Sequence, residues 1–353
     1  MWVLDNTTPM AAERGWVRDK NGAEVWLVAV KGTFDILPDG STVLSEEQEK
    51  VALASEFAGD PQCSSLLFDT DLPHKKLGTD VLVRGHVYAP TGNPATRVSA
   101  GISVGPINKI LQVTGDRIWQ SSTGTVSASD PEPFDKIPIA YERAYGGMDL
   151  TSEDPMKHDW DKRNPAGCGF ALKERNLLGK PVPNFEDRNA LINRAPRKTA
   201  PVGFGPIAGH WLPRVNLAGT YDEHWEKTRQ PLLAEDFDER YYQCAPVDQQ
   251  VPGYLKGGED VNLVNLSQNG RITFRLPRLS LGFTTHFDDG TTQEHRGVLH
   301  TVTLMPDFPK FTMVWHTDLE CHHKVLKLNS TAIRIKERMF VSDRGNQRRS
   351  EAS

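Results

Sequence analysis

Cysteine is scarce in this chain of 353 residues, and its four cysteines lie far apart. None of them belongs to a Cys-x-x-Cys pair, whereas disulfide frameworks and thiolate zinc sites depend on paired or closely spaced cysteines. We therefore expect separate, reduced thiols and a cytoplasmic protein. The four positions are Cys63, Cys168, Cys244 and Cys321.

Long hydrophobic runs are missing as well. No stretch approaches the roughly 18–20 apolar residues that a bilayer-spanning helix requires. Residues 1–18 mix Asp5, Glu13 and Arg14 with short apolar runs, whereas a secretion signal has a basic start and then a continuous apolar segment. We expect neither a membrane partner nor a secretion signal.

An excess of positive charge is also absent. The chain has 41 Lys and Arg against 46 Asp and Glu, which gives a formal net charge of −5. Proteins that bind nucleic acids usually carry a basic face, so this balance argues against a nucleic-acid partner. The hydrophobic content of 38% suffices for a core and is too high for a wholly disordered chain.

The motifs of common enzyme and metal sites do not occur. There is no Gly-x-Ser-x-Gly elbow, phosphate-binding loop, His-Glu-x-x-His helix or EF-hand loop. The best cluster of metal-ligand types contains two adjacent histidines, which would point to opposite faces of a strand. We predict no metal, no cofactor and no enzymatic activity. The residues considered as ligands are His295, His300, His316, Cys321, His322 and His323.

Glycine and proline are abundant, with 29 and 24 residues. They favour turns and short strands over long helices. Alternating apolar segments bounded by turn residues predict strands in both the first and the last third of the chain. The segments are 25–36, 81–88, 97–104, 109–119, 271–276, 281–287, 298–305 and 310–315.

Residues 121–250 lack such regular patterns but contain many prolines, glycines, charged residues and aromatic residues. Disordered linkers are poor in aromatic residues, so this region is expected to be ordered but irregular. Short helices are expected at 220–229 and 236–244.

These patterns predict a mainly β fold with two β-sandwich-like lobes joined by the irregular, Pro/Gly/aromatic-rich region with its short helices. The N-terminal lobe is expected at 1–120, the connecting region at 121–250 and the C-terminal lobe at 251–329. Residues 330–353 are polar and basic, and we expect a flexible tail there.

Carboxylates near aromatic residues in the middle region leave an enzymatic alternative open. A hydrolase acting on carbohydrate would need two carboxylates about 5–10 Å apart, and aromatic rings would stack on sugar. The competing interpretation is that these carboxylates pair with nearby arginines and hold the backbone. The candidates are Glu142, Glu186, Asp222, Glu235 and Asp236.

An ordered series of short motifs resembles the domain-of-unknown-function 2169 family, which is linked to bacterial type VI secretion. Each motif is weak alone, but the ordered set is specific and spans about residues 25–315. The motifs lie at 30–34, 76–81, 85–90, 113–119 (VTGDRIW), 141–147 (YERAYGG), 164–169 (NPAGCG), 183–186, 204–206, 211–214, 219–222 with Trp225, 236–238 and 245–249.

This resemblance implies an adaptor, or effector chaperone. Such a protein would hold a type VI secretion effector in the cytoplasm and promote its loading onto the VgrG spike or its PAAR tip. The family offers no agreed catalytic residues to carry over. A structural component of the secretion apparatus is a further alternative.

An adaptor needs a preformed surface with aromatic and arginine anchors, because these residue types dominate interface hot spots. The middle region supplies both, although the same side chains could serve only to pack and pin an irregular fold. The candidate partner-binding residues are Trp119, Tyr141, Arg143, Tyr145, Trp211, Arg214, Tyr221, Trp225, Arg229 and Phe237.

Overall fold

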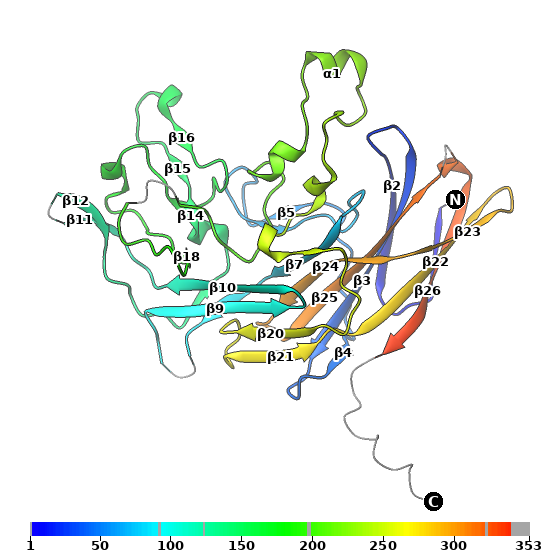
Figure 1. Ribbon diagram of the computed structural model, residues 1–353, viewed down its shortest axis with the longest axis horizontal. Helices are drawn as coiled ribbons and strands as arrows, with labels where there is room; N and C mark the ends of the chain where they lie inside the picture. The colour runs from blue at the N-terminus through cyan, green and yellow to red at the C-terminus, as the bar shows by residue number, and fades with distance from the viewer. Residues whose placement is uncertain (1, 91–92, 123, 196–198, 322–323, 340–353) are drawn as a thin grey trace, which may run out of the picture.

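The computed structural model describes residues 2–90, 93–122, 124–195, 199–321 and 324–339. Within these ranges the fold is mainly β, as the sequence predicts (Figure 1). The one α-helix described is α1 (Glu223–Thr228), and the other helical segments are 3-10 turns. No helix in the described ranges combines the length and apolar content needed to cross a membrane.

The largest sheet has seven strands, and its longest strand, β3, has eleven of its 13 residues buried. A strand covered on both faces needs an almost continuous apolar run, which β3 supplies in VWLVAV. The order is β19-β7-β24-β25-β3-β2, with β4 beside β3, and β7 and β24 run parallel. The bounds are β2 (Ala11–Arg18), β3 (Glu24–Ile36), β4 (Thr42–Leu44), β7 (Gly78–Val83), β19 (Gln250–Pro252), β24 (Val298–Met305) and β25 (Lys310–Glu320).

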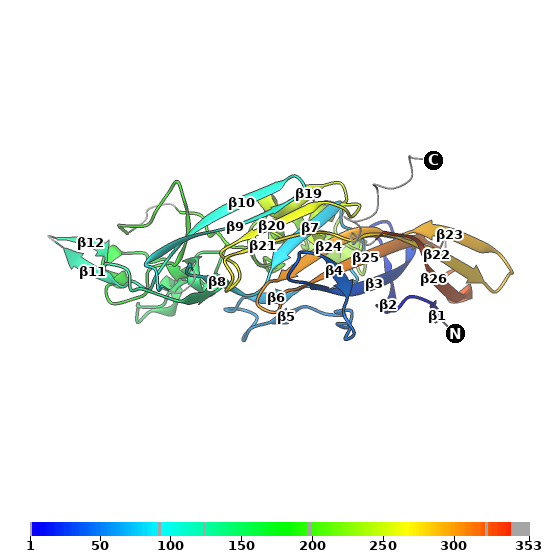
Figure 2. The same cartoon turned by 90° about the horizontal axis from the view of Figure 1, so that it is seen from below.

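A five-stranded sheet packs on the seven-stranded sheet, and Figure 2 shows the two as layers. Phe311 of β25 stacks on Phe34 of β3 with ring centroids 5.1 Å apart, and on Phe274 of β21 at 5.0 Å. The main hydrophobic core therefore lies between these sheets. The strand order is β18 (Phe185–Asp187), β10 (Ile107–Thr114), β9 (Arg97–Val104), β20 (Asp260–Val264) and β21 (Arg271–Arg275).

A four-stranded sheet covers the other end of β3. Nε1 of the buried Trp26 donates to Oγ1 of Thr331, 3.0 Å away, which joins β3 to β26. The tail expected from residue 330 onward is corrected here, because residues 330–339 belong to β26 and pair with β22 and β1. Residues 340–353 lie outside the described ranges. The order is β1 (Val3–Asn6), β26 (Leu328–Met339), β22 (Arg278–Phe287) and β23 (Thr292–Arg296).

The two β regions at the ends of the chain do not form separate lobes as expected. β9 pairs with β20, β24 lies beside β7, and β25 lies beside β3, so both regions contribute strands to the same sheets. Each region alone would leave more strand edges and apolar faces unpaired, and joining them pairs β9 with β20, β7 with β24 and β3 with β25. The boundaries at 120 and 250 therefore do not separate independent sheets.

The irregular middle region contains very short strands and 3-10 turns, together with α1. The helix expected at 220–229 is α1, whereas the one expected at 236–244 is the 3-10 turn η5. The remaining strands are β5 (Glu56–Phe57), β6 (Leu66–Phe68), β8 (His86–Tyr88), β11 (Trp119–Ser122), β12 (Thr125–Ala128), β13 (Lys136–Pro138), β14 (Tyr145–Gly146), β15 (Met148–Asp149), β16 (Asp159–Trp160) and β17 (Cys168–Gly169). The 3-10 turns are η1 (Tyr141–Arg143), η2 (Pro155–Lys157), η3 (Glu174–Leu177), η4 (Arg214–Leu217), η5 (Glu239–Tyr242), η6 (Val247–Gln249) and η7 (Val325–Lys327).

Candidate functional site

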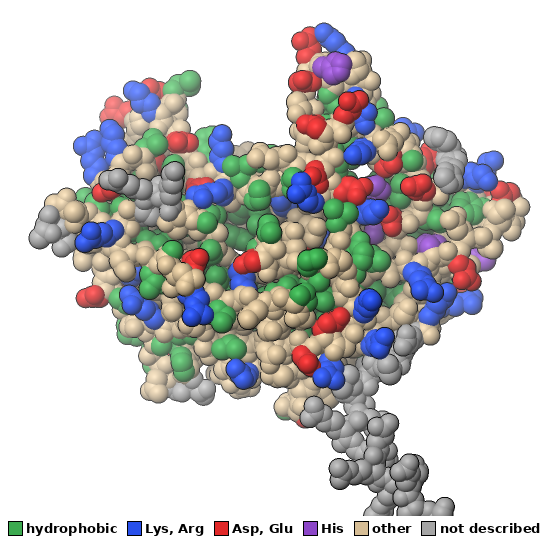
Figure 3. Space-filling view, in the orientation of Figure 1, with side chains coloured by type: hydrophobic (Ala, Val, Ile, Leu, Met, Phe, Trp, Pro, Cys, Tyr) green, Lys and Arg blue, Asp and Glu red, His purple; other side chains and the backbone are tan. Residues whose placement is uncertain are grey.

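Residues 218–238 form an arm that carries α1 and projects from the body of the molecule (Figures 1 and 3). Asp222 caps α1, because its Oδ1 accepts a hydrogen bond from the backbone N of Trp225 at 2.9 Å. Tyr221 packs edge-on against Trp225, with ring centroids 4.8 Å apart. Arg229 donates to the carbonyls of Leu233 and Lys20, so the arm is bonded to the turn between β2 and β3.

Arg214 organises the base of the arm. Its guanidinium donates to Oδ2 of Asp69 at 2.9 Å, to the carbonyl of Tyr241 at 2.9 and 3.0 Å, and to the carbonyl of Ile207 at 2.5 Å. Burial opposes ionisation of Asp69, but Arg214 and Lys76 outweigh it and hold its pKa below the usual value. This charged network fixes three chain segments against one another.

An open pocket of about 400 Å³ lies at this base, and we call it the aromatic pocket. Its ring-bearing walls come from segments far apart in the chain. Phe57 of β5 packs on His210 at 5.9 Å, and His74 packs on Tyr242 at 6.1 Å, both between ring centroids. Tyr241 and Tyr242 are 6.0 Å apart. The pocket is therefore defined by Phe57, His74, His210, Tyr241 and Tyr242, with Asp69 and Arg214 also lining it.

Several polar tips in the aromatic pocket are free to bind a ligand. The hydroxyls of Tyr241 and Tyr242 and the imidazoles of His74 and His210 have no hydrogen-bond partner among the described residues. Burial, followed by the charge of Glu239, raises the pKa of Tyr242 to about 12, so its hydroxyl stays protonated and can donate. Amphipathic rings with unpaired polar tips are typical of protein-binding surfaces.

A buried polar network in β7 and β24 supports this site. Nζ of Lys76 donates to Oδ2 of Asp80 at 2.7 Å and to Oγ1 of Thr301 at 3.0 Å. Nδ1 of His300 lies 2.7 Å from Oγ1 of Thr301, and its Nε2 donates to the carbonyl of Asp71, 3.1 Å away. Because Thr70, which precedes Asp71, lines the aromatic pocket, the network ties the pocket wall to the central sheet.

Burial keeps the histidines of this region neutral. It holds the pKa of His300 well below the usual value and lowers that of His316 to about 3, with nearby positive charge acting in the same direction. For Lys76, burial favours the neutral amine, but Asp80 outweighs it and the pKa is raised. The network is thus an ion pair between the Lys76 ammonium and Asp80, with neutral histidines beside it, and it holds structure.

A sequence profile of the family described as "Uncharacterized protein conserved in bacteria (DUF2169)" matches residues 21–316. The chain belongs to this family. The match covers the five-stranded sheet, most of the seven-stranded sheet, the whole middle region and the five rings of the aromatic pocket, whereas β2 lies before it. No curated protein and no solved structure matches the chain.

All ten candidate binding residues fall within the range matched by the DUF2169 family, and six of them are buried. The Tyr141 ring meets that of Trp211 edge-on at 5.7 Å, and its hydroxyl donates to the carbonyl of Gly205 at 3.2 Å. Such side chains hold the fold and offer a partner almost no surface. The six buried residues are Trp119, Tyr141, Tyr145, Trp211, Arg214 and Phe237.

The other four candidates, Arg143, Tyr221, Trp225 and Arg229, lie nearer the surface but not in one place. Arg214 lines the aromatic pocket, and Tyr221, Trp225 and Arg229 belong to the arm above it. Arg143 is apart from them in another cleft, where Nη1 donates to Asp116 at 2.9 Å. The structure thus gathers five of the ten candidates around the arm and its base, because Phe237 also belongs to the arm and packs against Tyr241 and Tyr242.

Sequence reasoning missed the five rings that define the aromatic pocket. Tyr241 and Tyr242 stand next to each other, and His210 precedes a candidate tryptophan, so these three had a local signal in an aromatic-rich segment. Phe57 and His74 had none, because they lie in the N-terminal region and reach the pocket only through folding.

The carboxylates that a hydrolase would use are instead engaged in hydrogen bonds and ion pairs within the protein. Glu142 accepts hydrogen bonds from the backbone N of Ser65, at 2.7 Å, and from its hydroxyl. Glu186 is buried, accepts from Oγ1 of Thr114 at 2.5 Å, and lies 3.1 Å from Nη2 of Arg117. Both carboxylates therefore fix backbone or pair with arginine, which is the competing interpretation of the sequence.

The three remaining carboxylates belong to the arm. Asp222 caps α1, Glu235 is exposed and lies 3.6 Å from Arg229, and Asp236 accepts from the backbone N and hydroxyl of Thr220 at 2.8 Å each. They surround no common cavity with Glu142 or Glu186 in the described pockets.

The histidines and cysteine weighed as metal ligands are separated or occupied. His295 lies between Thr285 and Thr317, with hydrogen bonds of 2.9 and 2.6 Å. Sγ of Cys321 lies 3.4 Å from the carbonyl of Leu319. His322 and His323 fall outside the described residues. In the part of the chain that is described, no three ligand-type side chains gather around a common point.

Proposed function

We propose that this chain is a non-enzymatic adaptor, or chaperone, for a bacterial type VI secretion effector. It would hold the effector in the cytoplasm and promote its loading onto the VgrG spike or the PAAR tip. The ordered motif series of the sequence suggests this role, and the aromatic pocket beneath the arm supports it.

The observation that carries the proposal is that the tyrosine hydroxyls and histidine imidazoles of the aromatic pocket have no hydrogen-bond partner among the described residues. Five rings converge on an open space of about 400 Å³, while the Asp69–Arg214 pair beneath them is already satisfied within the protein. A rigid, partly apolar surface with unused donors suits a protein partner, because little side-chain entropy is lost when it binds.

The arm extends this surface. Tyr221 is 47% exposed and packs on Trp225, and the arm carries charged side chains of both signs (Figure 3). Its contacts with the turn after β2, through Arg229, hold it beside the pocket. A partner seated in the aromatic pocket can therefore touch the arm as well.

Co-expression of the tagged chain with the effector and spike proteins encoded nearby tests the proposal. We expect the effector to co-purify, to elute with the chain in size-exclusion chromatography, and to lose solubility when the chain is omitted. Absence of a complex with every neighbouring protein would refute the adaptor role.

Two further measurements separate the alternatives. A structural component of the apparatus would be found in the secreted particle, whereas an adaptor stays in the cell. A carbohydrate hydrolase would show turnover that is lost in Glu142→Gln or Glu186→Gln, and the adaptor proposal predicts no such turnover.

A further inference from the structure

Arg84 differs from the other arginines that are not fully exposed. Arg117, Arg143, Arg163, Arg214 and Arg229 each donate to a carboxylate, an amide or a carbonyl. Arg84, which follows β7 and is half-buried, makes no side-chain hydrogen bond or ion pair with the described residues. Its guanidinium instead lies over the Phe68 ring, 3.7 Å from the centroid.

A half-buried cation without a partner is costly, because it has lost water and gained no acceptor. Burial accordingly lowers the pKa of Arg84, against the opposing effect of Glu49 and Glu56. Stacking on Phe68 satisfies the face of the guanidinium but leaves the N–H donors at its edge unused. These donors have the fork geometry that binds a carboxylate through two parallel bonds.

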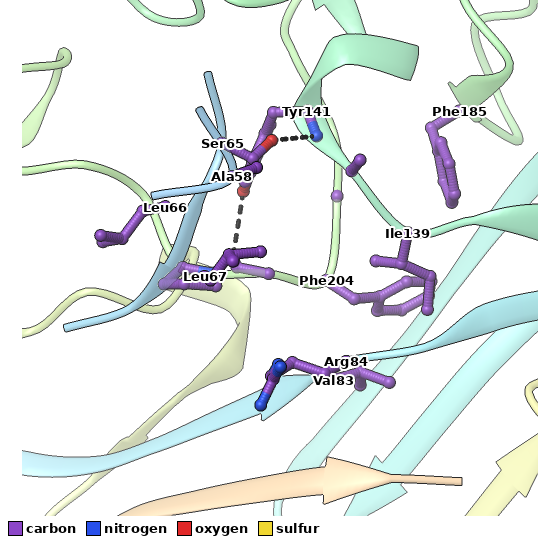
Figure 4. Close-up of a pocket in the computed structure, with 14 residues that line it drawn as sticks. Ala58, Ser65, Leu66, Leu67, Val83, Arg84, Ile139, Tyr141, Phe185 and Phe204 are labelled. Atoms are coloured by element: carbon purple, nitrogen blue, oxygen red, sulfur yellow. Dashed lines mark hydrogen bonds between the residues drawn. The ribbon is translucent and has the colours of Figure 1, made fainter. Parts of the chain in front are cut away.

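Arg84 lines a second cavity, separate from the aromatic pocket (Figure 4). The other walls are mostly apolar, with Val83, Ile139, Phe185 and Phe204 among them. Phe185 and Phe204 are fully buried and form its floor, whereas Ala58 is exposed and stands at its mouth. A ligand would reach apolar side chains and one unpaired cation together.

The polar groups of this cavity other than Arg84 already bond to the protein. Oγ of Ser65 accepts from the backbone N of Tyr141 at 2.8 Å, as Figure 4 shows, and the hydroxyl of Tyr141 donates to Gly205. A ligand therefore finds no second set of polar side chains here that would recognise a sugar or a nucleotide.

The size of the cavity limits the ligand further. Its volume is about 70 Å³, whereas pockets for drug-sized ligands or cofactors measure about 300–1,000 Å³. This space suits one aliphatic side chain. The C-terminal residue of a polypeptide carries a side chain and a carboxylate on the same Cα, so it matches an apolar hole beside a guanidinium.

We infer that this cavity captures the C-terminal residue of a partner polypeptide, with an aliphatic side chain inside and its terminal carboxylate on Arg84. This inference rests on the proposed polypeptide-binding function and names the chemistry of a second contact. Capture of a chain terminus by a preformed site is a recurring mode of peptide recognition.

Calorimetric titration of the purified chain with short peptides tests the inference. The probes are acetyl-Gly-Ser-Gly-Leu with a free carboxylate, the same peptide as its amide, and the free acid ending in serine. We expect saturable binding of the leucine acid, with the amide and the serine peptide each at least about tenfold weaker, because a bond to a charged group is lost or the cavity stays unfilled.

Two variants locate the contacts. Arg84→Gln should weaken the leucine acid at least about tenfold and remove the difference between acid and amide. Ala58→Leu should block the mouth of the cavity and weaken both. Arg163→Gln is the matched control, because this half-buried arginine pairs with Asp161 and does not line the cavity, and the variant should bind as the wild type does.

The peptide series on the wild type does not depend on any variant folding correctly. Equal affinity for acid and amide, or no binding at millimolar concentration, would overturn the inference. If the peptides fail while an effector still co-purifies, only this inference falls. If neither binds, the proposed function falls with it.

Discussion

Nη2 of Arg214 lies 2.9 Å from Oδ2 of Asp69, a partner 145 residues away in the chain. Both side chains are largely buried at the edge of the aromatic pocket. The pair joins the segment after β6 to the base of the arm, so one interaction fixes both the fold and the proposed binding surface.

Removing one member of this pair should destabilise the protein strongly. Arg214→Met leaves the Asp69 carboxylate buried without its cation, and we expect a loss of about 3 kcal/mol in the free energy of unfolding, measured by urea denaturation. Adding Asp69→Asn should recover part of the loss. Arg240→Gln breaks an exposed pair with Asp238 and should cost less than about 1 kcal/mol. Equal losses in the two single variants would contradict this account.

Stability should fall in mild acid because two buried histidines, His300 and His316, and the half-buried His295 resist protonation. Burial holds the pKa of His295 at about 4, that of His316 at about 3 and that of His300 well below the usual value. The unfolded chain binds these protons near pH 6.5, so the unfolded state holds more protons between pH 6.5 and about 4. Stability is therefore retained above pH 6.5 and lost as the pH falls.

Urea denaturation at pH 7.5, 6.5 and 5.5 measures this effect. Each histidine contributes up to about 1.4 kcal/mol per pH unit within its window. His295→Gln should reduce the slope by about one proton, whereas His224→Gln, on the exposed helix α1, should leave it unchanged. A stability that does not change over this range would show that these histidines titrate normally.

Truncating the aromatic pocket should weaken effector binding without unfolding the chain. Phe57→Ala and His210→Ala remove rings that face the pocket, and we expect each to lower affinity about tenfold or more in surface plasmon resonance. Phe308→Ala is the control, because Phe308 is 73% exposed on the turn between β24 and β25, away from the pocket. An equal effect in all three variants would place the binding surface elsewhere.

The turn after β10 should tolerate no side chain at Gly115. A Cβ there would lie 1.8 Å from the carbonyl O of Glu132, so Gly115→Ala must displace backbone. We expect a loss of about 1–3 kcal/mol in thermal or urea unfolding. Gly15→Ala in β2 is the matched control, since its nearest neighbour would be Leu72 at 3.9 Å, and it should cost little. Equal stability of the two variants would contradict the close packing of this turn.

Local sequence determined the elements of this protein. The apolar run at 25–36 is β3, the alternating run at 97–104 is β9, and that at 271–276 is β21 with one residue fewer. Asp222 marks the start of α1 through its capping bond. These features follow from neighbouring residues, because alternation and capping act over a few positions.

Only the tertiary structure decided which strands are neighbours. The sequence predicted two lobes, yet β7 lies beside β24, and residues expected in a free tail became β26. Alternation shows that one face of a strand is buried but not what covers it. Which strands pair depends on how well their side chains pack together, and the partners can lie hundreds of residues apart in the chain.

The same limit applies to the candidate site. Composition drew attention to the aromatic middle region, where Arg214 and the arm do lie at the site. However, six of the ten candidate side chains, Arg214 among them, are buried. Phe57 and His74 line the pocket only because distant segments of the chain come together there. The same long-range packing places Arg84 over Phe68 without a hydrogen-bond partner among the described residues. The sequence sets which side chains are present. The fold sets how exposed each side chain is and which groups it contacts, because these two properties depend on every segment that packs nearby.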